Sequence, residues 1–322
     1  MSPSIIDSQV IPTPKSVGVK SSKSPLPEVK EFDAATATID DLVAALKVAG
    51  GVIIRNLLAQ DELDNIEKDV RPWLEKDKPW DGYAFPAETR RAYGLIGKSE
   101  TFALRIVGHL LWLGVTDALL TSTLECNWFG DKNDVSVSPP QVNNTIAFSI
   151  GPGARNQPLH RDDVVHHRCY SAVAEHELGR DAGIGFFVAG KRTTRANGAT
   201  RFIPGSHLWD YSEGPAREEQ TYYAELAPGD GFMILSGCFH GGSANTTEDQ
   251  ERLVYSTFST RGWMRQEENQ YLAVDTEKIK ELPRWLQERI GYGLSRPFLG
   301  WVDLKSPMSV LHPEHDNQDD LF

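Results

Sequence analysis

The sequence predicts a mainly β fold with flanking helices, in the form of a sandwich or jelly roll. Between about residues 141 and 260, short apolar stretches alternate with Gly, Pro and Asn, which is typical of strands joined by tight turns. On either side of this region the pattern is that of helices. The expected strands cover 142–150, 159–166, 183–190, 199–204, 222–226, 231–236 and 252–260.

The flanking segments are predicted from caps and apolar spacing. Thr38 precedes two acidic residues and Gly50-Gly51 follows the apolar run, which predicts a helix over about 38–48. Leu63, Ile66, Val70 and Trp73 recur at helical spacing. We expect a short buried strand at 52–54, a helix at 60–76, irregular chain at 77–100, two helical segments within 101–124 and a helix at about 276–290.

The chain divides into three parts by composition. Residues 1–30 contain many Ser, Pro and Lys with little hydrophobic periodicity, which predicts a flexible arm. Residues 31–305 form one folded domain, and residues 306–322 form an acidic tail.

Charge and cysteine content exclude several functional classes. The 45 acidic and 33 basic residues give a net charge of −12, which argues against nucleic acid or an anionic membrane as partner. A small hydrophobic molecule is the expected substrate. The three cysteines form no C-x-x-C pair, so a reducing environment is indicated. Because neither a signal peptide nor a membrane span is visible, a cytoplasmic location is expected.

The segment Gln157-Pro158-Leu159-His160-Arg161-Asp162-Asp163 carries the clearest chemical signal. In an extended strand, His160 and Asp162 point to one face and Arg161 points away. One carboxylate and two imidazoles form the facial triad that binds non-haem Fe(II). A histidine hydrogen-bonded to a nearby carboxylate is also an ordinary structural pair, so a second histidine must be found elsewhere.

His240 and His207 are the two candidates for that second histidine. A 2-oxoglutarate-dependent enzyme also needs an arginine for the free carboxylate of the co-substrate. Arg252 begins an alternating strand twelve positions after His240, whereas Arg217 follows His207 through a Gly- and Pro-containing loop. The pair His240 and Arg252 is therefore favoured. A strand arginine paired with a neighbouring acid is the structural alternative for Arg252.

Three motifs together resemble the phytanoyl-CoA dioxygenase-like family of Fe(II)/2-oxoglutarate oxygenases. They are the segment from Gln157 to Asp162, the segment Asn197-Gly198-Ala199-Thr200-Arg201-Phe202-Ile203-Pro204-Gly205-Ser206-His207, and His240-Gly241-Gly242 through Arg252. Within the family the chain is similar to the fungal secondary-metabolism branch, whose members tailor meroterpenoids and indole alkaloids. Gly300-Trp301-Val302-Asp303 is similar to that branch too.

This resemblance implies a double-stranded β-helix, a distorted cupin-like jelly roll. It implies Fe(II) on His160, Asp162 and His240, with 2-oxoglutarate and O2 as co-substrates. Arg252 would bind the distal carboxylate of 2-oxoglutarate. The positions of the family that contact 2-oxoglutarate match Gln157, Thr200 and, by a looser alignment, Arg105.

The expected activity is oxidation of an unactivated C–H bond of a fungal natural-product intermediate, with a meroterpenoid favoured, by a homodimer. Hydroxylation, desaturation, rearrangement and endoperoxidation are all compatible with the motifs. His166 is a candidate for the substrate pocket or for the surface, and Phe148 and Trp263 are candidates for its wall or for plain core packing. The alternative function is a cupin-like hydrolase or isomerase that uses the same triad without 2-oxoglutarate.

Overall fold

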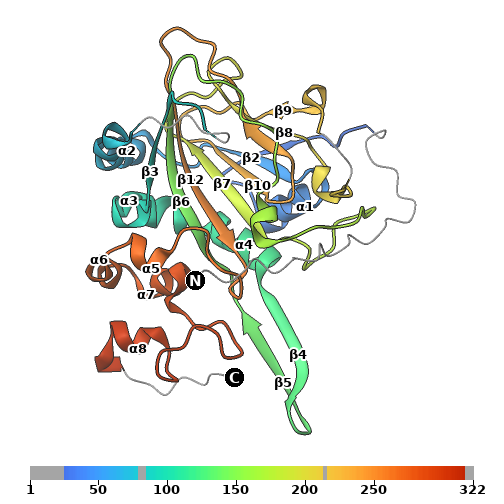
Figure 1. Ribbon diagram of the computed structural model, residues 1–322, viewed down its shortest axis with the longest axis vertical. Helices are drawn as coiled ribbons and strands as arrows, with labels where there is room; N and C mark the ends of the chain where they lie inside the picture. The colour runs from blue at the N-terminus through green and yellow to red at the C-terminus, as the bar shows by residue number, and fades with distance from the viewer. Residues whose placement is uncertain (1–24, 79–84, 213–215, 316–322) are drawn as a thin grey trace, which may run out of the picture.

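A large sheet and a small sheet form the centre of the computed structural model, which describes residues 25–78, 85–212 and 216–315. The large sheet has the strand order β1-β2-β10-β7-β12-β6-β3, and the small sheet has the order β11-β8-β9 (Figure 1). The strands of the large sheet are β1 (Lys30–Asp33), β2 (Gly51–Arg55), β3 (Thr89–Tyr93), β6 (Gln141–Ile150), β7 (Gly183–Ala189), β10 (Gly231–Leu235) and β12 (Arg252–Thr260). Those of the small sheet are β8 (Thr200–Phe202), β9 (Tyr222–Tyr223) and β11 (His240–Gly242).

Helices cover one face of the large sheet. Helix α1 (Ile39–Ala49) contacts β10, helix α4 (Leu110–Leu120) contacts β7, and the two helices contact each other. Helix α2 (Gln60–Lys76) contacts β3 and β6. The short helices are α3 (Glu100–Phe102), α5 (Gln270–Ala273), α6 (Thr276–Glu281), α7 (Arg284–Gln287) and α8 (Pro307–Leu311).

Strand β7 shows how the two faces of the sheet differ. All its residues are buried, because it lies between the helices and the interior of the molecule. Phe186 stacks on Trp112 of α4, with ring centroids 5.1 Å apart. Phe187, the next residue, points to the opposite face and lines a cavity there. The pleat therefore separates a helix-packed core from the face that carries the candidate site.

The two N-terminal helices form where their capping residues and apolar spacing predicted them. The Thr38 hydroxyl accepts a hydrogen bond from the Asp41 amide, and Gly50 ends α1 with a left-handed φ of 75°. A side chain at Gly50 would also collide with Cys238 and His207. Helix α2 occupies the predicted range 60–76, and the Glu62 carboxylate accepts a hydrogen bond from the Ala59 amide at its start.

Four sequence expectations differ from the structure. The segment predicted as irregular contains β3, which pairs with β6. The hairpin formed by β4 (Ser122–Phe129) and β5 (Lys132–Ser138) was not predicted and projects from the body of the molecule (Figure 1). The expected strand 159–166 is a single bridge at His160 followed by a 3-10 helix. The expected helix 276–290 is broken at Leu282-Pro283, because proline lacks the amide hydrogen that would continue α6.

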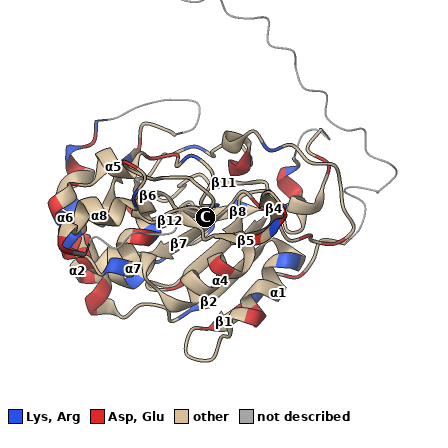
Figure 2. Cartoon of the chain, turned by 90° about the horizontal axis from the view of Figure 1, so that it is seen from below, with Lys and Arg blue, Asp and Glu red and all other residues tan. Residues whose placement is uncertain are grey.

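The predicted segment boundaries can be compared only in part. Residues 1–24 of the predicted arm and 316–322 of the predicted tail lie outside the described residues. Packing continues beyond residue 305, because α8 buries Met308 and Leu311 against the core. Acidic and basic positions are interspersed over α1, α2, α6 and α7 in the view of Figure 2.

Within the described ranges, no single helix has the length and apolar composition needed to cross a membrane. One bent pair, Glu100–Val107 with Leu110–Leu120, meets that test jointly across a 55° break.

Candidate active site

Two histidines from distant segments lie side by side. His160 and His240 form an antiparallel bridge in which each amide donates to the carbonyl of the other over 2.9 Å. The imidazole Nδ1 of His160 lies 2.9 Å from the Pro158 carbonyl, and that of His240 lies 3.1 Å from the Cys238 carbonyl. With Nδ1–H donating to these carbonyls, each Nε2 keeps a free lone pair suited to a metal ion.

Asp162 supplies the acid between the two rings. It starts the 3-10 helix Asp162–His166, and its amide donates to the Ser236 carbonyl over 2.9 Å. Its Oδ1 lies 3.3 Å from Nε2 of His160, and its Oδ2 lies 3.3 Å from Nε2 of His240. Burial alone would raise the pKa of Asp162, but His240 and His160 lower it well below its usual range. The carboxylate is therefore ionised, as a metal ligand must be.

The spacing of these donors fits a divalent metal ion. The three donor atoms all lie within 4.8 Å of one another. Ligands at right angles with metal bonds of about 2.1 Å are separated by about 3 Å, close to the 3.3 Å found here. Two imidazoles and one carboxylate are the donor set that suits Fe(II) and leaves further coordination positions open.

Arg161 points away from the triad, as its position between the two ligands predicts. Its guanidinium donates to the carbonyls of Gly237 and Ser206 and lies between the rings of Tyr211 and Phe239. These contacts fix the backbone between His160 and Asp162, which is extended at Arg161 (φ −117°, ψ 135°) although the residue belongs to no strand.

A cavity opens beside the triad over β6 and β12. Because side chains alternate along a strand, β6 directs every second residue from Asn144 to Ile150 into this cavity. Strand β12 contributes Arg252, Val254 and Phe258. The wall is thus apolar along its middle and polar at both ends.

Arg252 is a buried cation that has no anionic partner in the part of the chain that the structure describes. It is 4% exposed, and one guanidinium nitrogen donates to the Thr200 hydroxyl over 2.7 Å. Among the described residues its Nε has no hydrogen-bond partner, and no carboxylate lies within ion-pair distance of its guanidinium. Burial lowers the pKa of Arg252 to about 10, which leaves it charged near neutral pH. A buried charge of this kind calls for an acidic ligand.

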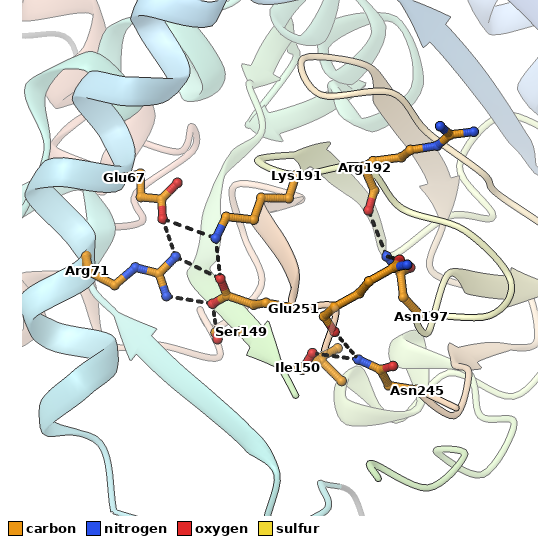
Figure 3. Close-up of polar contacts among 10 residues, drawn as sticks. Glu67, Arg71, Ser149, Ile150, Lys191, Arg192, Asn197, Asn245 and Glu251 are labelled. Carbon is orange, nitrogen blue, oxygen red and sulfur yellow. Dashed lines mark hydrogen bonds and ion pairs between the residues drawn. The ribbon is translucent and has the colours of Figure 1, made fainter. Parts of the chain in front are cut away.

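A polar cluster holds the start of β12 in place (Figure 3). The Glu251 carboxylate, next to Arg252, accepts hydrogen bonds from Arg71 of α2, from Lys191 and from the Ser149 hydroxyl of β6 (Figure 3). On the other side, Asn245 donates to the carbonyls of Ile150 and Gln250. The backbone that carries the Arg252 side chain is therefore held in place by contacts with several neighbouring segments.

Gln157 lines the cavity on the side where Arg252 lies. Its amide oxygen accepts from the Gly242 amide over 3.0 Å. Arg201, which is buried, donates to the carbonyls of Gln157 and Gly242 and pairs with Glu218. Arg201 was not predicted as a site residue. Alternation along β8 places its side chain on the face opposite to that of Thr200.

The comparisons with known proteins agree with this geometry. The family model described as Phytanoyl-CoA dioxygenase (PhyH) matches residues 46–254. The chain belongs to the phytanoyl-CoA dioxygenase family. This assignment confirms the resemblance drawn from the sequence motifs.

Relatives in the family cover nearly the whole chain. Dioxygenase cnsJ of Penicillium expansum is 40% identical over 306 residues, which cover 94% of this chain and 91% of that protein. Dioxygenase peniF of Penicillium patulum is 42% identical over 280 residues, 86% of this chain and 90% of that protein. The crystal structure of SnoK, a non-heme alpha ketoglutarate dependent carbocyclase from nogalamycin biosynthesis, matches with a TM-score of 0.51. The match covers 74% of this chain and 92% of that chain at 15% identity, which shows a shared fold.

Three residues predicted for the site of this family member lie outside its cavity. Arg105 is exposed and forms an ion pair with Glu62 of α2, because the helical segment that carries it lies on the far side of the sheet. His166 lies at the end of the 3-10 helix, with Nε2 3.0 Å from the Arg265 carbonyl. Trp263 is exposed in a different groove. The His166 prediction assumed that the strand continued that far, and the chain forms a 3-10 helix instead. The Arg105 prediction rested on a loose alignment with the family.

The remaining predicted residues line the cavity. Phe148 contributes its ring, which lies 5.5 Å from that of Phe85. Gln157, Thr200 and Arg252 lie toward one end of the cavity. The sequence reasoning missed Asn144 and Glu267, which also line it. Alternation from Phe148 could have identified Asn144, whereas nothing in the sequence places Glu267 there.

Proposed function

We propose that this member of the phytanoyl-CoA dioxygenase family is an Fe(II)- and 2-oxoglutarate-dependent oxygenase. Its proposed reaction is oxidation of an unactivated C–H bond in a hydrophobic natural-product intermediate. The observation that carries the proposal is the placement of the triad and the unpaired cation Arg252 in one cavity.

Each polar residue has a proposed role in binding. His160, Asp162 and His240 would hold Fe(II), because their donor atoms converge and Asp162 is ionised. Arg252, oriented by Thr200, would bind the distal carboxylate of 2-oxoglutarate. When bound, Fe(II) with 2-oxoglutarate and O2 supplies an oxidant strong enough to abstract hydrogen from an unactivated carbon.

The protein itself determines which carbon reacts. Phe148, Phe187 and Phe258 provide an apolar wall that excludes water and holds a substrate next to the triad. Small differences in that position decide between hydroxylation, desaturation, rearrangement and endoperoxide formation. The fungal relatives support a substrate from fungal secondary metabolism, and the meroterpenoid expected from the sequence stays a prediction.

The finer description of the fold is part of the same proposal. The small sheet and the His160 bridge would form the minor sheet of a distorted jelly roll, and β10, β7, β12 and β6 would form the major sheet. The triad would then lie at the open end between the two sheets.

The test is anaerobic addition of Fe(II) and 2-oxoglutarate to the full chain, followed by visible absorption. We expect a charge-transfer band from the chelated iron, and succinate once O2 and a substrate are present. A cupin-like hydrolase or isomerase with the same triad would give neither signal. A band of full intensity in Asp162→Ala would contradict the proposed ligand set.

We also propose that the chain forms a homodimer through the β4–β5 hairpin. An isolated two-stranded hairpin is marginally stable in water, and this one exposes Leu124, Val135 and Val137. Sedimentation of the wild type and of Val135→Asp tests this proposal. A monomeric wild-type chain would refute it. The cytoplasmic location stays a prediction.

A further inference from the structure

Glu267 places a carboxylate in the wall of the proposed active-site cavity. Its Oε2 accepts hydrogen bonds from Asn144 over 2.6 Å and from Asn143 over 3.3 Å. Its amide donates to the Asn143 side-chain oxygen over 2.8 Å. Both asparagines belong to β6, so the carboxylate is fixed in orientation by a rigid strand.

This carboxylate has no cationic partner in the described parts of the chain. Among the described residues no Lys, Arg or His lies within ion-pair distance of Glu267, and the hydrogen bonds to its carboxylate both go to Oε2. The side-chain oxygen of Asn144, which is 4% exposed, also lacks a donor. Glu267 is exposed as a residue and also lines the cavity, so its free carboxylate oxygen is open to a hydrogen-bond donor on a ligand.

The surroundings of Glu267 favour a positive charge. Phe187 and Phe258 meet edge to face in the cavity wall, with centroids 5.4 Å apart, and Phe148 lies along the same wall. Aromatic faces attract cations, so these rings favour a positively charged group bound beside the carboxylate. Glu267 and the triad line the same cavity, and partial burial together with the nearby negative charge of Asp162 raises the pKa of Glu267.

The two charged ends of the cavity are well separated. Arg252 pairs with Ile150 at one end of β6, and Phe258 pairs with Asn144 six residues along the strand. Six residues of strand span about 20 Å. An acid bound at Arg252 therefore does not compete with a base bound at Glu267.

We propose that Glu267 is the specificity-determining residue for the organic substrate and binds a protonated amine on it. The proposal rests on the proposed function and narrows its substrate to a compound that carries a basic nitrogen. Anchoring the nitrogen at Glu267 would fix which carbon lies next to the triad.

The test compares two probes with the same rings, N-benzylpiperidine, which is protonated near neutral pH, and N-benzoylpiperidine, which is a neutral amide. Each is titrated by calorimetry, without O2, into the full chain loaded with Fe(II) and 2-oxoglutarate. We expect the amine to bind about tenfold more tightly than the amide, because only the amine can pair with the carboxylate. Glu267→Gln should remove that preference and bind both probes alike.

Glu281→Gln is the matched control. Glu281 is exposed on α6 and does not line the cavity, and its substitution makes the same change in net charge. It should keep the wild-type preference. Equal binding of the two probes to the wild type, no binding of the amine, or a preference that persists in Glu267→Gln would overturn the proposal. The iron absorption band reports the proposed function separately, since Glu267→Gln should keep it. If the wild type shows no band, the proposed oxygenase function is refuted, while the comparison of the two probes can still be interpreted.

Discussion

Glu251 offers the most direct test of how the fold supports the proposed co-substrate site. Its carboxylate joins α2, β6 and Lys191 at the residue that precedes Arg252 (Figure 3). Replacing it by Gln keeps the shape but removes the charge that holds Arg71 and Lys191. We expect a loss of stability together with weaker binding of 2-oxoglutarate.

The size of the stability effect follows from the pKa of Glu251. Burial alone would raise this pKa, but the contacts with Arg71, Lys191 and Ser149 lower it from 4.5 to about 2. At about 1.36 kcal/mol per pH unit this difference corresponds to about 3.4 kcal/mol. Because the side chain is 23% exposed, solvent screening reduces the expected loss in Glu251→Gln to about 2 kcal/mol.

The sign of the pH dependence is fixed by the lowered pKa. In the unfolded chain Glu251 binds a proton near pH 4.5, and in the folded chain it does so only near pH 2. Its contribution to the free energy of unfolding is therefore complete above about pH 4.5 and is lost as the pH falls toward about 2. The gap between wild type and Glu251→Gln should close over that window.

Urea unfolding at several pH values measures the stability, and the iron absorption band measures 2-oxoglutarate binding. We expect the 2-oxoglutarate concentration at half saturation to rise about fivefold in Glu251→Gln, because Arg252 loses its fixed backbone. Glu67→Gln is the control, since Glu67 pairs with Arg71 and Lys191 of the same cluster but is not adjacent to Arg252 in the chain. Identical effects of the two variants on 2-oxoglutarate binding would refute the positioning argument.

Three further outcomes are expected. Asp162→Ala should abolish turnover and Fe(II) binding, since only two histidines remain; calorimetry with Fe(II) measures this, and wild-type affinity would exclude the triad. Arg252→Ala should weaken 2-oxoglutarate binding roughly 100-fold with little change for the organic probe amine, and equal losses would move the co-substrate site elsewhere. Burial lowers the pKa of His207 to about 4, so the free energy of unfolding should fall by about 3 kcal/mol between pH 6.5 and about 4. His207→Gln should flatten that slope in urea titrations, and an unchanged slope would assign it to other groups.

Several features of the site follow from local sequence. The alternation in β6 and β12 places Phe148 and Arg252 on one face of each strand, because a pleated strand fixes side-chain direction without help from its neighbours. The cap at Thr38 and the left-handed Gly50 likewise set the ends of α1 by contacts within a few residues. The spacing of His160 and Asp162 indicated a ligand pair, although the strand predicted between them is absent.

By itself, then, the sequence predicted five strands of the large sheet, the family, and the residues proposed for the triad and its arginine. Only the tertiary structure decided that His160 bridges His240, that Arg105 pairs with Glu62 away from the cavity, and that Glu267 lines the cavity. The physical reason is that these three placements depend on contacts between segments remote in the chain. Strand register and the return path of loops fix such contacts, and neither is encoded within a single local pattern.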